Sequence, residues 1–458
     1  MDNDHPLERA YRAFSPASAA LFQRALGVFP GGDTRSSAHY APYPLSIQEA
    51  KGCTLTDLDG NQLLDFMNNF TSLIHGHGFA PVVSAVQQQI AIGSAHAAPG
   101  LQQIELAELI CERVPSVEQL RFTSSGTEAT QMAIRCARAA TGRQKIMKME
   151  GGYHGSYELA EVSLVAWPDQ RGPLSAPVSL PVDASFPRAV LNDTIVCPYN
   201  QPQLARQLIS DHAHELAAVI VEPVLGSMGM IPAEEEFLQA LREETRQAGI
   251  VLIFDEVISL RLDQGGTQSI VDVQPDMTCM GKIIGGGLPV GAVGGRRDLM
   301  DLFSPAQKQP VMHASTFSAN ALTMSAGLAA MQAYDAKETA RINDLGDLLR
   351  QSFNRAFAQS GIGGQAIGRG SLTNLHLTTA PLNDARDSMA AMAEAGHVGR
   401  LLHLSMLRHG VMSASRLMYS VSTAMDESHI ERACTALHES LAELRPYIEQ
   451  ERPALIVA

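Results

Sequence analysis

The sequence predicts an α/β protein with a large domain around a mainly parallel sheet and a smaller α+β domain. Three observations predict this class. The chain has 458 residues, which is too long for one small core and favours two or three structural units. Over residues 71–325, short apolar or β-branched runs alternate with helical patterns, the layout of repeated strand and crossover-helix units. From residue 326 the pattern changes to long helices with a few short strands.

Four runs in the large domain are the clearest strands. They are residues 119–124, 145–149, 217–221 and 250–255. Each run is apolar enough to be covered on both faces, as in a parallel sheet, and each ends in a polar or glycine-rich turn. Ligands of open α/β sheets bind outside the carboxyl ends of the strands, so we expect the functional residues to meet there.

The smaller domain is expected at residues 326–458. It should begin with a long helix at 326–359, continue with strands at 371–378 and 416–422, and close with an amphipathic helix from Asp426.

The N-terminal segment, residues 1–70, is expected to pack beside this smaller domain. It carries its own helix and a hairpin-like stretch at 53–66, in which Asp59-Gly60 is the turn signal.

Composition and charge exclude several classes. The formal net charge is −14 and no stripe of Lys and Arg is present, so we expect no nucleic-acid partner. Neither a signal-peptide pattern nor a run of about eighteen apolar residues occurs, so we expect a cytoplasmic protein with no membrane partner. The six cysteines form no C-x-x-C pair and predict neither a disulfide scaffold nor a zinc site, and we expect no metal.

The segment 122–129, Phe-Thr-Ser-Ser-Gly-Thr-Glu-Ala, leads from a strand into a predicted helix at 127–140. Ser125, Gly126 and Thr127 would present backbone N–H groups and hydroxyls at the helix N-terminus, which favours a bound anion. Serine and threonine are also ordinary helix caps. The segment alone therefore indicates either an anion site or a cap.

Two charged residues stand in apolar surroundings. Asp255 closes the strand at 250–255, where a buried carboxylate needs a partner such as a cationic ring nitrogen; the alternative is a cap for the next helix. Lys282 stands in Met-Gly-Lys-Ile-Ile-Gly-Gly-Gly, where a desolvated amine becomes a nucleophile for a carbonyl. The three glycines imply a close approach to the backbone. The alternative is a glycine-rich turn whose lysine reaches solvent.

Two further motifs end at the same sheet edge. In Gly-Gly-Tyr-His-Gly at 151–155, Tyr153 could stack on a flat ring, whereas a histidine such as His154 is more often structural. Glu222 follows the strand at 217–221 and is either a plain loop residue or a partner for a ligand's phenolic oxygen.

Together and in this order, these motifs resemble those of the class III aminotransferases, which have the type I fold of pyridoxal 5'-phosphate (PLP) enzymes. The matching motifs are Ser-Gly-Thr-Glu-Ala, Tyr-His-Gly, Glu-Pro, Asp-Glu-Val, Gly-Lys and Thr-Phe-Ser, and the resemblance extends over residues 30–422. It implies PLP as the cofactor, carried by Lys282 as a Schiff base, and makes Lys282 the catalytic residue.

The same resemblance implies the other cofactor contacts. Ser125, Gly126 and Thr127 would hold the phosphate. Tyr153 would stack on the ring, and Asp255 would pair with the pyridine nitrogen. The remaining cofactor-binding residues implied are His154, Glu222, Val257 and Thr316. In family members the threonine at the place of Thr316 reaches the phosphate of the neighbouring subunit's cofactor, so a homodimer is implied.

Closer still is the branch of the β-amino-acid (β-phenylalanine-type) aminotransferases and glutamate-1-semialdehyde aminomutase, which shares Pro-Gly-Gly-Asp-Thr-Arg-Ser at 30–36. In that branch the arginine at the place of Arg35 binds a substrate carboxylate with its fork of donors. Arg416 stands where related enzymes keep an arginine for the second substrate's carboxylate. The alternatives are a surface arginine at 35 and a structural ion pair at 416. Ser227 replaces the second glutamate of ornithine- and GABA-type members, which weakens an ω-amino-acid assignment.

The sequence therefore predicts a PLP-dependent aminotransferase that moves an amino group from a β-amino acid or related amine to a keto acid, 2-oxoglutarate or pyruvate, by a ping-pong mechanism. The alternatives are a glutamate-1-semialdehyde-type 2,1-aminomutase, an amine transaminase without a carboxylate requirement, and a non-catalytic PLP-binding protein. The last of these would not need Lys282, Asp255 and Tyr153 together.

Overall fold

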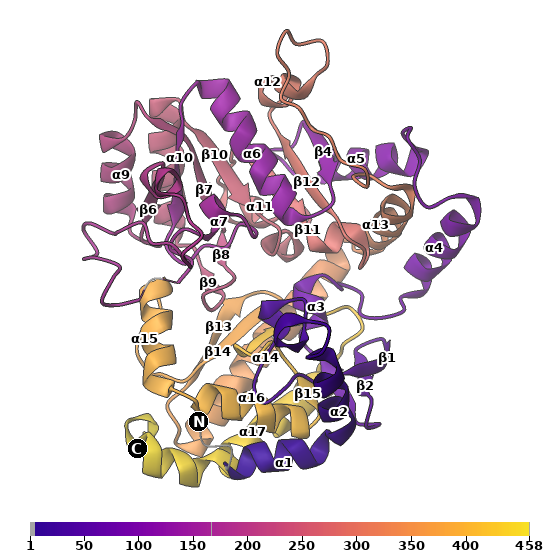
Figure 1. Cartoon of the computed structure of the whole chain (residues 1–458), viewed down its shortest axis with the longest axis vertical. Coiled ribbons are helices and arrows are strands. Elements are labelled where there is room, and N and C mark those ends of the chain that lie inside the picture. Colours follow the sequence, from indigo (N-terminus) through magenta and orange to yellow (C-terminus); the bar gives the residue numbers. More distant parts are fainter. Residues whose placement is uncertain (1–4, 166, 458) are drawn as a thin grey trace. The chain divides into compact units, whose positions relative to one another are not determined.

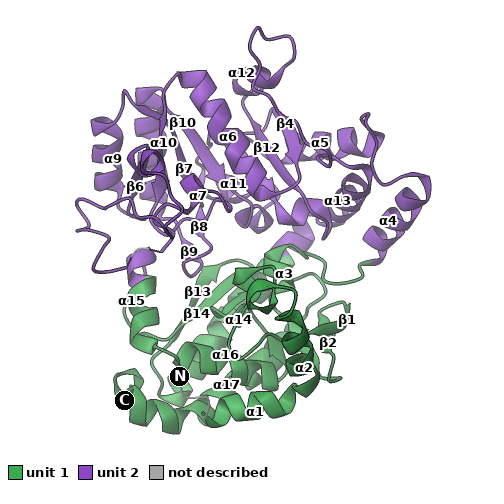
Figure 2. Cartoon of the chain, in the orientation of Figure 1, with its two compact units in different colours: residues 1–79, 341–381, 388–458 green, residues 80–340, 382–387 purple. Residues whose placement is uncertain are grey.

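The computed structural model describes residues 5–165 and 167–457, which form two compact units (Figures 1 and 2). Within the described residues, unit 1 comprises residues 5–79, 341–381 and 388–457. Unit 2 comprises residues 80–340 without residue 166, together with residues 382–387. Each unit thus joins segments that are far apart in the sequence.

Unit 2 is built on a seven-stranded sheet with the order β4-β12-β11-β10-β7-β5-β6 (Figure 1). Its strands are β4 (Gln119–Thr123), β5 (Lys145–Met149), β6 (Thr194–Cys197), β7 (Leu216–Val221), β10 (Val251–Asp255), β11 (Met277–Gly281) and β12 (Gly291–Gly295). Only β12 runs against the others, because it pairs antiparallel with β11 and β4 while the remaining pairs are parallel. The predicted mainly parallel sheet is confirmed, and the four predicted strands end within one residue of their expected bounds.

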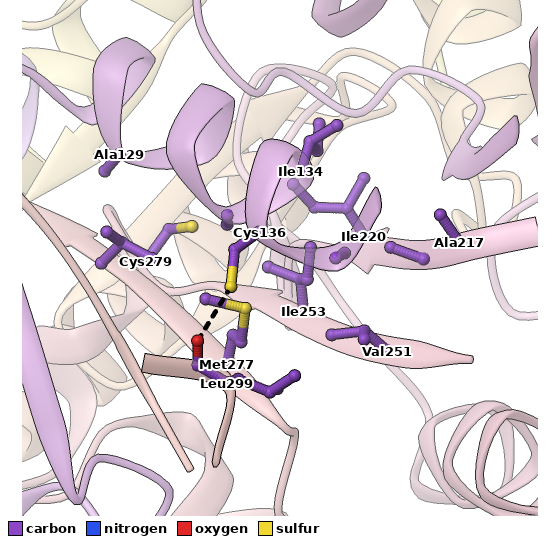
Figure 3. Packing of buried hydrophobic residues seen from close by; sticks show 14 of the residues in the cluster. Ala129, Ile134, Cys136, Ala217, Ile220, Val251, Ile253, Met277, Cys279 and Leu299 are labelled. Carbon is purple, nitrogen blue, oxygen red and sulfur yellow. Dashed lines mark hydrogen bonds between the residues drawn. The ribbon is translucent and has the colours of Figure 1, made fainter. Parts of the chain in front are cut away.

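Helix α6 (Gly126–Thr141) packs on this sheet (Figure 3). Its buried Ala129, Ala133 and Cys136 belong to the same core cluster as Ile220 of β7 and Ile253 of β10. Small side chains on the helix allow close packing against the β-branched residues of the strands. Burial of each large apolar side chain stabilises the fold by about 1.5–3 kcal/mol. This core holds the start of α6 at a fixed place beside the strand ends.

Unit 1 contains two small sheets, of order β1-β2-β3-β15 and β13-β14-β16. Their strands are β1 (Ile47–Lys51), β2 (Thr54–Asp57), β3 (Gln62–Asp65), β13 (Gln365–Arg369), β14 (Leu372–His376), β15 (Val411–Met412) and β16 (Met418–Ser420). The helices include α1 (Pro6–Phe14), α2 (Pro16–Ala25), α14 (Ala336–Ser360, which enters from unit 2), α16 (Val398–Arg408) and α17 (Glu427–Glu451).

The predicted hairpin is confirmed by the antiparallel pair β2–β3. Asp57 shapes its turn, because its Oδ1 accepts the N–H groups of Asp59 at 2.9 Å and Asn61 at 2.8 Å. The closing helix is confirmed as α17, which begins after Asp426, and the carboxylate of Asp426 caps it by accepting the N–H of Ser428 at 3.0 Å.

The prediction of one long helix at 326–359 is wrong, because two helices cover this region. Helix α13 (Ala321–Ala333) ends before Tyr334, whose φ of −91° and ψ of 80° leave the helical region. Asp335 then caps α14, since its Oδ1 accepts the N–H of Glu338 at 2.9 Å. The break is short and apolar residues lie on both sides of it, so the sequence pattern does not reveal it.

Two other expected bounds differ from the structure. The strand expected at 416–422 is reduced to β16, because Leu417 has a φ of 63° and Arg416 lies in the turn before it. The compact units change at residues 79/80 and 340/341, whereas the sequence places domain changes at 70/71 and 325/326. Helix α13 packs on α4 (Ala80–Ile92) and α5 (Leu101–Arg113), which explains its place in unit 2. The assignment of functional domains stays a prediction.

Candidate active site

Five strands of the large sheet present their carboxyl ends at one edge, because β4, β5, β7, β10 and β11 all run in the same direction. Each of them leads into, or ends on, one of the residues singled out from the sequence. In the order of these strands, the residues are Ser125, Tyr153, Glu222, Asp255 and Lys282. The sheet therefore brings together groups that are up to 157 positions apart (282 − 125).

Ser125 is the N-cap of α6, and its Oγ accepts the N–H of Glu128 at 3.2 Å. In return, the Glu128 Oε2 accepts the N–H of Ser124 at 2.6 Å, so the two side chains cap the turn reciprocally. A Cβ at Gly126 would lie 3.1 Å from Cγ2 of Val257, a tight contact that would require Val257 to shift by a few tenths of an ångström. Ser125 therefore is a helix cap, one of the two alternatives expected from the sequence. The positive end of the helix dipole still lies at this N-terminus, which favours a bound anion.

Asp255 forms a buried pair with His154, whose Nδ1 lies 2.8 Å from the Asp255 Oδ2. The other carboxylate oxygen, Oδ1, accepts the N–H of Val257 at 3.1 Å. Burial lowers the pKa of His154, although the hydrogen bond to Asp255 acts in the opposite direction. Within the described chain, Nε2 of His154 is buried without a hydrogen-bond partner. His154 therefore holds the Oδ2 atom of Asp255 in place.

Glu222 follows β7 and is 4% exposed. Its Oε2 accepts the N–H of Tyr153 at 2.9 Å, and its Oε1 accepts the N–H of Gly226 at 3.3 Å. Burial raises the pKa of Glu222 to about 8, with Asp255 adding to the rise and Lys282 opposing it. The carboxyl group thus orders two loops at once.

Lys282 directly follows β11 and has a positive φ of 48°, which only a strongly determined backbone imposes on a lysine. Burial lowers the pKa of its amine, while Asp255 and Glu222 act to raise it. A lowered pKa supplies the unprotonated amine that attacks carbonyl carbon.

The glycines after Lys282 have a structural cause. A Cβ on Gly286, whose φ is 59°, would lie 2.4 Å from the carbonyl oxygen of Ala326. The close approach expected from the sequence is therefore made at this position by helix α13. It does not require a ligand.

Tyr153 and Thr316 are the remaining candidate residues in unit 2. Tyr153 is half-buried, and its hydroxyl lies 3.1 Å from Oγ of Ser156. Thr316 is exposed, in the loop between residues 304 and 320 that precedes α13. Met312 and Phe317 in the same loop are 65% and 62% exposed, so this loop presents apolar surface.

The two arginines lie in unit 1. Arg35 is exposed, its Nη1 donates to Oδ1 of Asn69 at 3.1 Å, and its guanidinium lies 6.0 Å from the ring centre of Phe70. Arg416 is exposed in the turn between β15 and β16. Arg35 forms no ion pair with a carboxylate among the described residues, whereas Arg416 takes part in further contacts with its neighbours.

Sequence reasoning missed three residues that order this edge. Glu128 caps the turn at Ser124, and the Thr130 Oγ1 donates to the carbonyl of His154 at 2.5 Å. Lys148 is completely buried in β5 and donates to three main-chain carbonyls. Two of the three carried a signal: Ser125-Gly-Thr-Glu128 has the S-x-x-E pattern of a capping box, and Lys148 is a charged residue inside a strand expected to be covered on both faces.

An open α/β sheet with a partly buried lysine, a buried aspartate and a capped helix N-terminus at its carboxyl edge is typical of the type I fold of PLP-dependent enzymes. Residues 36–439 match the family model described as Aminotransferase class-III. The chain belongs to the class III aminotransferases, and its cofactor is PLP. Among the residues that the structure describes, no helix is long and apolar enough to cross a membrane.

Similar proteins divide between two activities. The β-phenylalanine transaminase of Variovorax paradoxus is 37% identical over 438 residues, which cover 95% of each chain. The glutamate-1-semialdehyde 2,1-aminomutase of Thermodesulfovibrio yellowstonii is 36% identical over 434 residues, 93% of this chain and 99% of the relative. The crystal structure of an ω-transaminase from Sphaerobacter thermophilus is 46% identical, has a TM-score of 0.89, and the match covers 94% of this chain and 98% of that chain.

Proposed function

We propose that this enzyme transfers an amino group from a β-amino acid to a keto acid, 2-oxoglutarate or pyruvate, in two half-reactions of a ping-pong mechanism. The likeness to the β-phenylalanine transaminase supports this donor class. The structural observation that carries it is Arg35, an exposed guanidinium that donates one side-chain hydrogen bond, to Asn69, and keeps further donors within the described structure. A β-amino acid brings the carboxylate that such a group binds.

We propose that the carboxyl edge of the sheet in unit 2 holds PLP. The group fits the residues present: the N-terminus of α6 at Ser125, Gly126 and Thr127 suits a phosphate, and the buried carboxylate of Asp255 suits a protonated ring nitrogen. Tyr153 lies at the same edge and would stack on the ring. The further proposed cofactor contacts are His154, Glu222, Val257, Lys282 and Thr316.

When bound, PLP supplies a carbonyl carbon that takes up the amino group and a ring that accepts electrons from the substrate. Lys282 would hold the cofactor through its Nζ, and this amine, once displaced by the amino group of the donor, would accept the proton from the donor's amino-bearing carbon. Burial favours this role because it lowers the pKa of the amine. Asp255 keeps the ring nitrogen protonated, and His154 keeps the carboxylate of Asp255 in place.

Two arginines are proposed for the substrate carboxylates. Arg35 would bind the carboxylate of the β-amino acid, and Arg416 would bind that of the keto acid. Both are exposed in unit 1, as a group that must receive and release substrates requires.

We also propose a homodimer in which Thr316 reaches the cofactor phosphate of the partner. Met312 and Phe317 in the same loop are exposed apolar side chains, which supports burial of this loop against a second subunit. A solution mass of twice the 49.1 kDa chain mass is expected in light scattering, and a mass equal to one chain would contradict the dimer.

The function is tested by supplying β-phenylalanine with and without a keto acid. Sustained product formation that needs the keto acid is expected. The second candidate is an aminomutase, favoured by the likeness to the glutamate-1-semialdehyde enzyme. It would turn over glutamate-1-semialdehyde without any keto acid, and that outcome would overturn the transferase proposal. An amine without a carboxylate, tested alongside, covers the amine-transaminase alternative; equal rates with both donors would show that no carboxylate is required.

A further inference from the structure

Lys148 is a charged residue in the interior of unit 2. It lies near the end of β5, between Met147 and Met149, and its exposure is 0%. A buried ammonium is costly unless polar groups surround it. Burial lowers its pKa to about 7, while Glu222, Glu150 and Glu161 oppose this shift. The mechanism proposed above gives this lysine no role.

The ammonium of Lys148 is bonded only to main-chain carbonyls in the part of the chain that the structure describes. Nζ lies 2.6 Å from the carbonyl oxygen of Val162, 2.9 Å from that of Gly152 and 3.3 Å from that of Met149. An ammonium has three N–H donors and no acceptor, so its capacity is matched by these three oxygens. Hydrogen bonds from a charged donor are also stronger than neutral ones.

Two of the three nearby carboxyl groups, Glu150 and Glu222, form hydrogen bonds to other residues. Glu150 is bonded to the guanidinium of Arg386, at 2.6 Å from Nε and 3.0 Å from Nη2. Glu222 accepts the two main-chain N–H groups described above. Lys148 therefore interacts with these carboxylates through charge alone, and its directed contacts are to backbone.

The carbonyls of Gly152 and Val162 stand at the two ends of the segment 153–161. This segment contains Tyr153 and His154. Next to these contacts, the N–H of Gly151 donates to the carbonyl of Ser163 at 2.8 Å and joins the same two ends of the segment. Lys148 thus closes the base of a loop whose first two residues, Tyr153 and His154, are proposed cofactor contacts.

Successive residues of this loop are each held by a different buried group. The carbonyl of Gly152 accepts from Lys148, and the next N–H, that of Tyr153, donates to Glu222. The ring of His154 then meets Asp255. Without Lys148, the carbonyl of Gly152 loses its charged donor. The main chain just before Tyr153 and His154 is then held less firmly, which weakens their contacts with Glu222 and Asp255.

We infer that Lys148 is a positioning residue, which fixes the loop 149–162 through the carbonyls of Gly152 and Val162 and thereby sets Tyr153 and His154 at the active edge. The inference concerns the order of the loop, and its consequence for turnover rests on the proposed function. Lys148 touches neither substrate nor cofactor in this assignment.

The test uses Lys148→Met, which keeps an unbranched apolar stem and removes all three donors. The matched control is Lys145→Met, which removes a lysine from the same strand whose amine pairs with Glu215. Amide hydrogen exchange of the full chain loaded with PLP is measured. In Lys148→Met the amides of residues 150–154 should exchange about tenfold faster or more, because a charge-assisted bond is lost, and the control should match the parent. With a working donor, kcat should fall about 10- to 100-fold while KM changes little.

Exchange in this loop that matches the parent would overturn the inference, whatever the activity of the variant. Equally faster exchange throughout the core of unit 2 would also overturn it, because it would make Lys148 a general stability residue. If the methionine variant does not fold, Lys148→Gln keeps two N–H donors and is measured instead, with an intermediate effect expected; a failure of both variants to fold counts against the inference. A chain that uses no β-amino acid but shows local loop opening would reject the proposed donor and leave the inference standing.

Discussion

The carboxyl edge of the sheet in unit 2 and the arginine-bearing turns of unit 1 hold their charged residues in opposite ways. Asp255 and Glu222 are 5% and 4% exposed, and both oxygens of each carboxylate have a hydrogen-bond partner. Arg35 and Arg416 are exposed and lie in short turns. Burial makes a charge costly, so these two carboxyl groups are tied to neighbouring groups. Arg35 is exposed and carries no such obligation, so it can bind a substrate that comes and goes.

The largest expected effect is at Lys282. Lys282→Ala should lower turnover at least about 10⁴-fold, because both the cofactor anchor and the proton-transferring amine are lost. The absorbance of bound PLP should change as well. A steady-state assay and an absorbance spectrum check this, and a variant with parent activity would contradict the mechanism.

Asp255→Asn should lower kcat by about 10²- to 10³-fold, because the ring nitrogen loses the carboxylate that keeps it protonated. The control is Glu256→Gln at the adjacent buried carboxylate, whose bonds go to the N–H groups of Thr267 and Gln268. That control should lower thermal stability and leave the spectrum of bound PLP unchanged. Equal spectral changes in both variants would mean that burial alone, and no specific pairing, matters at this edge.

Arg35→Ala should raise KM for a β-amino acid by about 10- to 100-fold and change kcat little, because a charge-assisted carboxylate contact is lost. Arg416→Ala should act instead on KM for the keto acid. Arg35→Lys separates charge from the fork of donors and should recover only part of the affinity. An unchanged KM in Arg35→Ala would show that Arg35 is a surface residue that does not bind the substrate. The contrast between a buried cofactor edge and an exposed substrate-binding arginine would then fail.

A further expected effect concerns stability and not turnover: the free energy of unfolding should depend on pH through Glu222. Its pKa is raised from 4.5 to about 8 in the fold, so between these values the folded chain keeps a proton that the unfolded chain has lost. Stability from this group is complete below the unfolded value and is lost as the pH rises through 8. Glu222→Gln should remove this slope, which reaches about 1.4 kcal/mol per pH unit. Denaturant unfolding of the cofactor-free chain between about pH 5 and 8 measures it.

The matched control for that experiment is Glu236→Gln at an exposed position of the helix Glu235–Ala248. Its stability profile should run parallel to that of the parent. If Glu222→Gln also runs parallel to the parent, then burial does not hold the proton on Glu222, and the contrast between the two regions is smaller than their exposures suggest.

Much of the fold was accessible from local patterns. The strands that became β5, β7 and β10 are apolar runs ended by polar turns, and this pattern arises wherever a strand is covered on both faces. Strands β11 and β12 were not anticipated. Met277–Gly281 has a single β-branched residue, Thr278, and Gly291–Gly295 is mostly glycine, so the strand character of both comes from pairing with neighbours. The break at Tyr334 was missed because no glycine or proline stands there, and the cap at Asp335 is the one local feature that marks it.

The sequence by itself determined the order of the motifs and so the family and the cofactor, because residues with reactive groups follow recognisable strand ends. The tertiary structure alone decided which groups pair. His154 meets Asp255 across 101 positions, and Lys148 reaches the carbonyl of Val162 in a segment that carries no motif. Such pairings depend on how crossover connections bring strand ends together, and on which charges burial leaves in need of a partner, and neither is written in the local order of residues.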